Sequence, residues 1–157
     1  MGISKTDEDW MQHALSLADK AEAMGEVPVG AVLVKDGQMA GEGWNQPITL
    51  HDPSAHAEVM AIRNAGKAIE NYRLPNTTLY VTLEPCTMCS GLMIHSRIQR
   101  IVFGAYDPKT GAAGSVFDTL IDERHNHTIE VVGGILETEC SNHLKAFFKK
   151  RRAQKKG

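Results

Sequence analysis

Two short motifs in the chain hold residue types that bind metal ions and move protons. The first is His56-Ala57-Glu58, and the second is Pro85-Cys86-Thr87-Met88-Cys89. Either motif alone is ambiguous, because a Cys-x-x-Cys pair also occurs as a redox pair or as two buried thiols. Together they supply one imidazole, two thiolates and one further carboxylate. Three protein ligands with an open fourth position are typical of a catalytic zinc site.

The spacing within each motif is consistent with this chemistry. Residues three apart share one face of a helix, so Cys86 and Cys89 can bind one ion from a first helical turn, whose positive end stabilises thiolates. His56 and Glu58 are two apart, about 200° around a regular helix, and cannot both point at one atom. We therefore expect His56 to bind the metal and Glu58 to reach the water beside it. His95, which follows the cysteines on the same predicted helix, is an alternative third ligand.

Predicted strands and helices alternate along the chain and position these motifs. Helices are expected from Thr6 or Asp7 to Gly25, over 55–65 with Gly66 closing the helix, from Pro85 to about His95, and from about Thr138 to Arg152. Strands are expected over 27–34, from the Asp36-Gly37 turn to about Trp44, and over 77–83, 100–105 and 129–132. This order predicts an α/β fold, with one five-stranded mixed sheet covered by helices on both faces.

Composition and charge are those of one folded domain over residues 1–157. Hydrophobic residues make up 42% and charged residues 23%, which excludes a disordered or fibrous chain. The net charge of −2 hides an uneven distribution, because residues 145–157 hold seven Lys and Arg and no acid. The remainder has 10 basic against 19 acidic residues, a net charge of −9. The basic helix or tail over about 138–157 can follow a phosphate backbone or remain a solvated tail.

The cysteines and the N-terminus indicate the compartment. The three cysteines are too few and too sparse for a disulfide framework and suit a reducing environment. The N-terminus is polar and acidic and lacks the apolar core of a signal peptide. No apolar run approaches the roughly 20 residues that span a bilayer. We therefore expect a cytoplasmic protein without a membrane partner.

The two motifs together resemble the zinc-dependent nucleobase and nucleoside deaminases, which carry a His-x-Glu and a Pro-Cys-x-x-Cys signature. The resemblance extends over about residues 8–152 and is most specific for the subfamily that acts on wobble adenosine. The similar segments are 26–32, 43–45, 51–58, 80–86 and 107–115. It implies a three-layer α/β/α fold of the cytidine deaminase type.

The resemblance also implies an activity, a cofactor and partners. The activity is the hydrolytic deamination of adenosine to inosine at the wobble position of a transfer-RNA anticodon. One Zn²⁺ per chain, held by His56, Cys86 and Cys89, would activate a water. Glu58 would carry that water's proton to the ring N1 and later to the departing amine. The implied partners are the anticodon stem-loop of a tRNA and a second copy of the chain in a homodimer.

Further residues are implied as substrate contacts, each with an alternative role. The expected contacts are Val29, Asn45, Ala57, Pro85, Asp107, Lys109, Phe148, Arg151 and Arg152. Asn45 could instead cap a turn, and 107–115 could be a flexible loop. Phe147 and Phe148 could both be core anchors of the last helix. Glu84 is either a zinc ligand or a buried structural carboxylate, and its place at a strand end favours the structural role.

Three questions stay open from the sequence. An apolar surface on the cysteine helix, formed by Met88, Leu92, Met93 and Ile94, belongs either to the core or to a dimer interface. A deaminase of free bases or nucleosides would share the fold and the zinc, although the basic helix and the 107–115 loop favour RNA. A non-catalytic, zinc-stabilised RNA-binding module would need a fourth protein ligand, and the sequence offers no obvious one.

Overall fold

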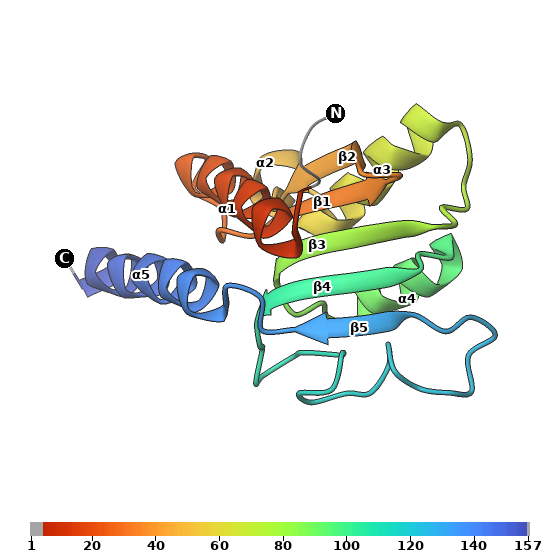
Figure 1. Cartoon of the computed structure of the whole chain (residues 1–157). Coiled ribbons are helices and arrows are strands. Elements are labelled where there is room, and N and C mark those ends of the chain that lie inside the picture. The colour runs from red at the N-terminus through yellow and green to blue at the C-terminus, as the bar shows by residue number, and fades with distance from the viewer. Residues whose placement is uncertain (1–4, 157) are drawn as a thin grey trace.

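The computed structural model describes residues 5–156 and places five strands in one mixed sheet, in the order β2-β1-β3-β4-β5 (Figure 1). The strands are β1 (Gly30–Lys35), β2 (Gln38–Trp44), β3 (Thr77–Leu83), β4 (Arg100–Ala105) and β5 (Glu130–Gly133). Strand β1 runs antiparallel to both β2 and β3, whereas β3, β4 and β5 are parallel. The predicted five-stranded mixed sheet is confirmed.

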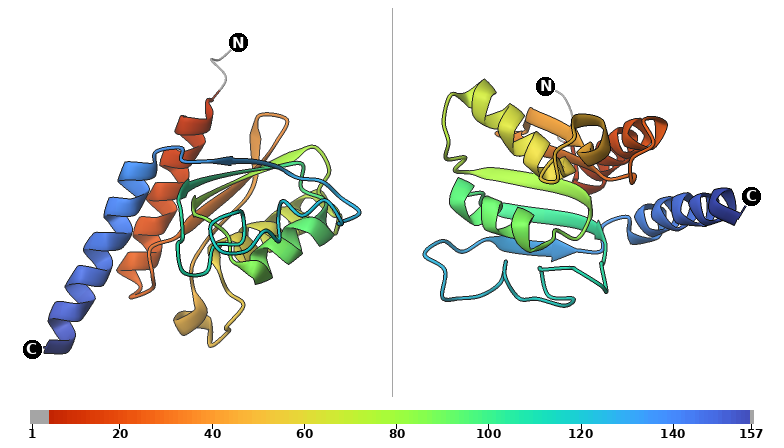
Figure 2. Two further views of the ribbon diagram at one scale, coloured as in Figure 1. Left: turned by 90° about the horizontal axis from the view of Figure 1, so that it is seen from below. Right: turned by 180° about the vertical axis from the view of Figure 1, so that it is seen from behind.

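Helices cover both faces of this sheet. They are α1 (Asp7–Ala23), α2 (Pro47–Leu50), α3 (Ala57–Ile69), α4 (Thr87–Ser96) and α5 (Glu137–Lys156). Helices α1 and α5 lie side by side on one face, and α3 and α4 lie on the other (Figure 2). The predicted three-layer α/β/α arrangement is therefore confirmed. No helix within residues 5–156 is both long and apolar enough to cross a membrane.

Helix α1 begins where its sequence predicts. Thr6 and Asp9 form a capping box, in which the Asp9 amide donates to the Thr6 hydroxyl at 3.2 Å and the Thr6 amide donates to the Asp9 carboxylate at 2.9 Å. The apolar side of the helix is buried against β1. Gly30 permits this close approach, because a Cβ atom there would collide with the backbone carbonyl oxygen of Ala14.

The predicted boundaries of the two motif helices are wrong by a few residues. Helix α3 begins at Ala57, with His56 as its N-cap, and continues through Gly66 to Ile69. The chain before it is held in a turn, because the Ser54 amide and hydroxyl both donate to the Asp52 carboxylate, at 2.8 and 2.7 Å. A glycine within a helix costs only about 1 kcal/mol, which packing of the helix on the sheet offsets.

Helix α4 and the loop after β2 show the same kind of difference. Cys86 is the N-cap of α4, so Pro85 precedes the helix and does not open it. The segment between Asn45 and Pro53, where neither a helix nor a strand is predicted, contains the short helix α2, with Pro47 as its first residue. Buried Glu26 stabilises α2 by accepting hydrogen bonds from the Ile48 amide and the Thr49 amide and hydroxyl.

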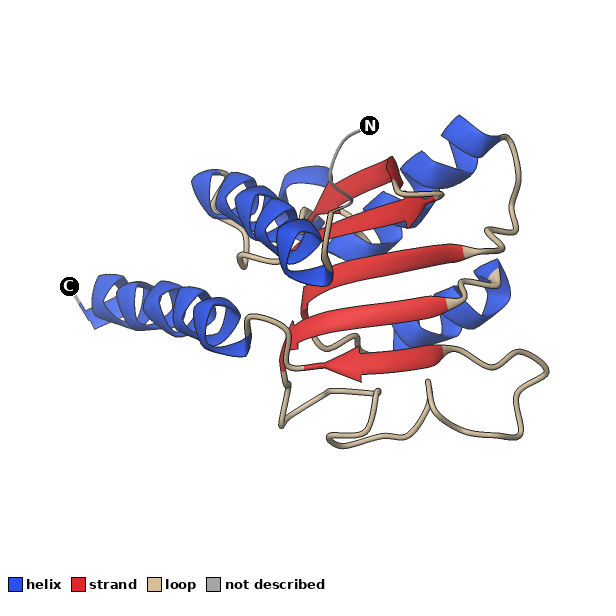
Figure 3. Cartoon of the chain, viewed as in Figure 1, coloured by secondary structure: helices blue, strands red, loops and turns tan. Residues whose placement is uncertain are grey.

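The sheet topology brings the ends of four strands to one edge. Gly30 at the start of β1 pairs with Trp44 at the end of β2, and Leu83 at the end of β3 pairs with Ala105 at the end of β4. Because β1 is antiparallel to β3, all four ends meet there. The connection over 106–129 contains neither helix nor strand (Figure 3), and α5 projects past this edge of the sheet (Figure 1). Residues that precede β1 or follow the other strands therefore lie close together.

Candidate metal centre and active site

The three predicted zinc ligands converge at the sheet edge. His56 Nδ1 lies 3.7 Å from Cys86 Sγ and 3.4 Å from Cys89 Sγ. For a tetrahedral zinc ion with Zn–S bonds of about 2.3 Å and Zn–N bonds of about 2.1 Å, the expected N···S separation is about 3.6 Å. Both cysteines are free thiols in the structure. The donor set and its spacing therefore fit zinc.

Two helix N-termini face this metal position. His56 is the N-cap of α3, while Cys86 is the N-cap of α4 and Cys89 is the third residue of that helix. Hydrogen bonds from Cys89 and His56 lower the pKa of the Cys86 thiol to about 4. The pKa of Cys89 is raised, because its thiol is hydrogen-bonded to Cys86 and is buried. The pair thus presents a thiolate in the positive field of the helix ends, ready to bind a metal ion.

Glu58 lies beside the ligands without being one of them. It occupies the first turn of α3 and is 4% exposed. The group of potential metal ligands at this position contains His56, Cys86 and Cys89 but not Glu58. Burial raises the pKa of the Glu58 carboxyl. A buried carboxyl next to a metal position is suited to proton transfer.

The alternative ligand His95 lies away from this centre. Its side chain is exposed near the end of α4, and it belongs to neither group of three or more potential ligands within residues 5–156.

The apolar residues of the same helix are divided between the core and the protein surface. Met93 and Ile94 are buried in the core, whereas Met88 is exposed.

Glu84 has a structural role and holds the 107–115 loop against the end of β3. Its carboxylate accepts hydrogen bonds from the amides of Asp107 at 3.1 Å, Ala113 at 3.0 Å and Ser115 at 3.1 Å, and from the Ser115 hydroxyl. Gly111 allows the loop to close, because a Cβ atom at this position would collide with the same carboxylate. The loop is therefore fixed beside the metal ligands.

Two of the expected substrate contacts are engaged in local structure near the centre. The Asp107 carboxylate accepts hydrogen bonds from the amides of Lys109 and Thr110, at 3.0 and 3.1 Å, and thereby shapes a turn that leaves Lys109 exposed. The backbone amide of Asn45 donates to the backbone carbonyl of Val29 at 3.0 Å and links the end of β2 to the start of β1. Ala57 and Pro85 are buried next to the ligands that they flank.

A groove of about 580 Å³ runs between this edge of the sheet and α5. Four expected substrate contacts line it, namely Asp107, Lys109, Phe148 and Arg152. The interpretation of both phenylalanines as core anchors is right for Phe147, whose side chain is 8% exposed. It is wrong for Phe148, which is 42% exposed and faces the groove. The two are neighbours on a helix and so point in directions about 100° apart.

Arg151 lies apart from the other expected contacts. It lines a separate cavity of about 310 Å³ between the end of α1 and α5, together with Glu22 and Phe147. Its guanidinium lies 5.4 Å from the centre of the Phe147 ring. Within the structure, Arg151 and Arg152 therefore belong to different faces of α5.

One residue that the sequence does not single out is Glu26, which anchors α2 close to Asn45. The available signal was an acid directly before the apolar run 27–34. Such an acid stays in a core only when its carboxylate is hydrogen-bonded.

Comparisons with known proteins agree with this geometry. Residues 4–105 match the family model of the cytidine and deoxycytidylate deaminase zinc-binding region. A solved structure from a study of A-to-I editing by tRNA:A34 deaminases at the wobble position is 42% identical, with a TM-score of 0.83 over 86% of this chain and 98% of that one. A guanine deaminase from Nitrosomonas europaea shares the fold at 21% identity, with a TM-score of 0.80 over 93% of this chain and 86% of that one.

Two relatives match nearly the whole chain. A tRNA-specific adenosine deaminase from Haemophilus influenzae is 61% identical over 154 residues, which cover 98% of this chain and 89% of that protein. One from Bacillus subtilis is 49% identical over 150 residues, covering 96% and 93%. The matched zinc-binding region contains all three converging ligands and Glu58. The chain therefore belongs to the cytidine and deoxycytidylate deaminase family.

Proposed function

We propose that this chain is a zinc-dependent deaminase that converts adenosine to inosine at the wobble position of a tRNA anticodon. The observation that carries the proposal is the three-ligand centre with buried Glu58 beside it. The 107–115 loop next to this centre also lines the groove that contains Lys109, Lys145 and Arg152. The names of the relatives identify the substrate class, since two proteins that match almost the entire chain are tRNA-specific adenosine deaminases.

The residues of the centre divide the chemistry between them. His56, Cys86 and Cys89 would hold the zinc ion, which when bound lowers the pKa of a water from 15.7 to about 7 and so supplies a nucleophile at neutral pH. Overall, water adds at C6 of the purine, the C6–N bond breaks, and ammonia leaves. In this proposal, Glu58 takes a proton from the attacking water, delivers it to N1, and passes a proton to the departing amine.

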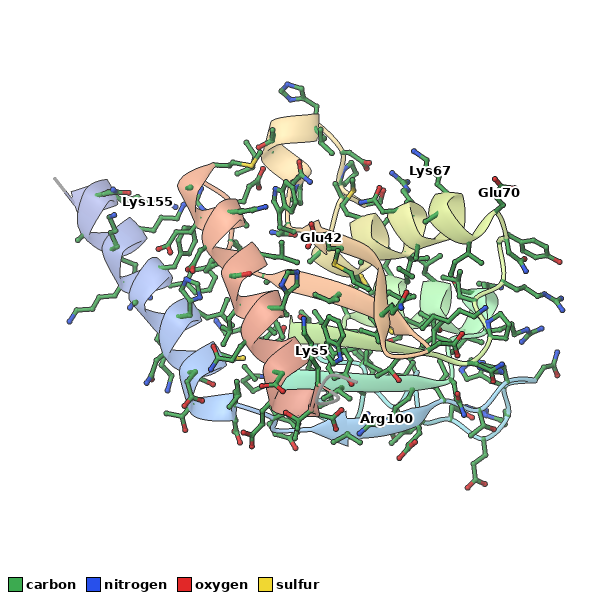
Figure 4. All side chains as sticks on the ribbon, turned by 45° about the horizontal axis from the view of Figure 1, so that its top comes forward. Lys5, Glu42, Lys67, Glu70, Arg100 and Lys155 are labelled. Atoms are coloured by element: carbon green, nitrogen blue, oxygen red, sulfur yellow. The ribbon has the colours of Figure 1, made fainter. Side chains whose placement is uncertain are left out.

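The groove accounts for an RNA substrate. A base must be unpaired or extruded to reach a buried centre, and an anticodon loop presents such bases. Lys109, Lys145 and Arg152 line the groove next to the exposed ring of Phe148, so that phosphates and a stacked base can both be contacted. Further basic residues continue along α5 as far as Lys155, which lies near its far end (Figure 4).

The proposal includes a homodimer in the cytoplasm. Exposed apolar side chains support a second copy as partner: Met88 on α4, and Val116, Phe117 and Ile121 on the connection between β4 and β5. Exposed apolar groups of this kind are typical of protein interfaces when they form a patch. Sedimentation analysis of the zinc-loaded protein is expected to give a dimer that Phe117→Asp weakens, and a monomeric wild type would contradict this part of the proposal.

The substrate is tested by comparing RNA with small molecules. The zinc-loaded protein is incubated with total bacterial tRNA, and inosine is located by sequencing, while ammonia release is measured from free adenosine, cytidine, cytosine and guanine. We expect inosine at a wobble position and no ammonia from the small molecules. Ammonia from a free base without inosine in tRNA would instead establish a small-molecule deaminase of the same fold.

A further inference from the structure

A second group of potential metal ligands joins α1 to α5. The His143 Nε2 atom lies 3.1 Å from the Asp19 carboxylate and 3.0 Å from the Glu22 carboxylate. Within residues 5–156 this is the one group of three or more such ligands besides His56, Cys86 and Cys89. It stands where the two helices run side by side (Figure 2).

The arrangement suits a divalent cation. Asp19 and Glu22 are three residues apart on α1, so both carboxylates face the same side of the helix. Two carboxylates with oxygens within 4.8 Å repel one another unless positive charge lies between them. One Nε2–H can donate a well-aligned hydrogen bond to one carboxylate only, whereas a metal ion binds both carboxylates and the imidazole nitrogen at once.

The distances require only a small adjustment. Zinc bonds of about 2.1 Å to nitrogen and oxygen place tetrahedral donors about 3.4 Å apart, roughly 0.3 to 0.4 Å more than the two distances seen here. The Asp19 side chain is 71% exposed and can move by this amount, whereas His143, at 19%, is held between the helices. The imidazole in the set favours a transition metal such as zinc over magnesium or calcium.

We propose that Asp19, Glu22 and His143 form a second divalent metal site, of the zinc class, that clamps α5 to α1. The site contains no sulfur and is separate from the catalytic centre. Helix α1 ends at Ala23, whereas α5 continues well beyond it (Figure 1). A metal at His143 therefore fixes the direction in which α5 carries Phe148 and Arg152 along the groove. Lys150 and Arg151 line the neighbouring cavity together with Glu22, and their positive charges disfavour a cation nearby. The site is therefore expected to bind metal more weakly than the thiolate centre and to exchange its ion with solvent.

Metal titration of the full-length, zinc-loaded protein tests this site. After dialysis leaves one zinc per chain, Co²⁺ is added and binding is followed by calorimetry and absorption. We expect one further ion per chain, without the sulfur-to-cobalt charge-transfer band that a thiolate site gives. Excess Mg²⁺ is expected not to displace it. Full displacement of Co²⁺ by Mg²⁺ would show that only the two carboxylates bind the ion, without the imidazole, and would overturn the proposal.

Matched variants locate the ion. His143→Ala and the surface variant Asp19→Asn should each lose the additional ion and the rise in melting temperature that it causes in the wild type. The control is His13→Ala, because His13 contacts a single carboxylate, that of Glu42, at 2.7 Å. This variant should bind the additional ion as the wild type does. Equal binding by all four proteins, or no additional ion in the wild type, would overturn the proposal.

Discussion

The hydrogen bonds of Glu84 make its replacement by glutamine a sharp test of the site architecture. One carboxylate oxygen accepts the Asp107 amide and the Ser115 hydroxyl, and the other accepts the Ala113 and Ser115 amides. In Glu84→Gln, an NH₂ group replaces one oxygen. The less costly orientation turns it toward the Ser115 hydroxyl, which can rotate to accept, and leaves the Asp107 amide without a partner.

The magnitude follows from these contacts. An orphaned buried amide costs about 1 to 3 kcal/mol, and each remaining hydrogen bond loses roughly 1 kcal/mol when its acceptor is no longer charged. We therefore expect a loss of about 3 kcal/mol in the free energy of unfolding. For a chain of this length that is a fall of roughly 6 to 12 °C in melting temperature.

The assay combines melting temperature, zinc content and inosine formation. Glu84→Gln should keep its zinc and lose activity, because the 107–115 loop is no longer fixed beside the ligands. The control is Glu130→Gln, since Glu130 is 67% exposed and 3.7 Å from Arg100, and its loss should change stability by less than about 1 kcal/mol. A melting temperature within about 2 °C of the wild type would show that the hydrogen bonds of Glu84 do not stabilise the loop as described. Loss of zinc would show instead that Glu84 is a metal ligand.

Three further predictions concern the metal, the acid stability and the basic helix. His56→Ala should lower bound zinc from about one ion per chain to near zero, as measured by elemental analysis; unchanged zinc would exclude His56 as a ligand. The Arg100 guanidinium lies 2.6 Å from the Asp7 carboxylate and lowers the pKa of that carboxyl in the folded protein. The pair therefore stabilises the fold at any pH above about 3.9, the pKa of an aspartate in the unfolded chain. This stabilisation is lost as the pH falls through the lower pKa of Asp7 in the folded protein. The deficit in melting temperature of Asp7→Asn should therefore be largest near pH 7 and shrink below about pH 4, and a deficit independent of pH would contradict this. Removing residues 149–157 should weaken tRNA binding and flatten its dependence on salt, and unchanged binding curves would leave these residues without that role.

The metal ligands could be predicted because their geometry is local. Cys86 and Cys89 are separated by one helical turn, and both motifs stand at the start of a helix, so spacing alone fixes much of the arrangement. The order of strands and helices likewise predicts the layers. It does not fix the ends of α3, because a glycine at position 66 is a weak signal that packing overrides.

The rest of the site depends on contacts between distant segments. The bonds that Glu84 accepts reach 23 to 31 residues along the chain, and Glu26 holds amides 22 and 23 residues away. The sequence marks such acids as unusual but does not identify their partners. Phe147 and Phe148 are indistinguishable by type. Their different burial follows from where α1 and the sheet lie around α5, which only the assembled fold determines.

The most direct test of the central claim is inosine formation at the wobble position of tRNA by zinc-loaded Glu58→Gln. The side chain keeps its size but can no longer accept and return a proton. We expect zinc content and tRNA affinity to stay at wild-type values while the rate falls by at least about 100-fold. A Glu58→Gln protein that forms inosine at the normal rate, or a wild-type protein that remains active without zinc, would contradict it.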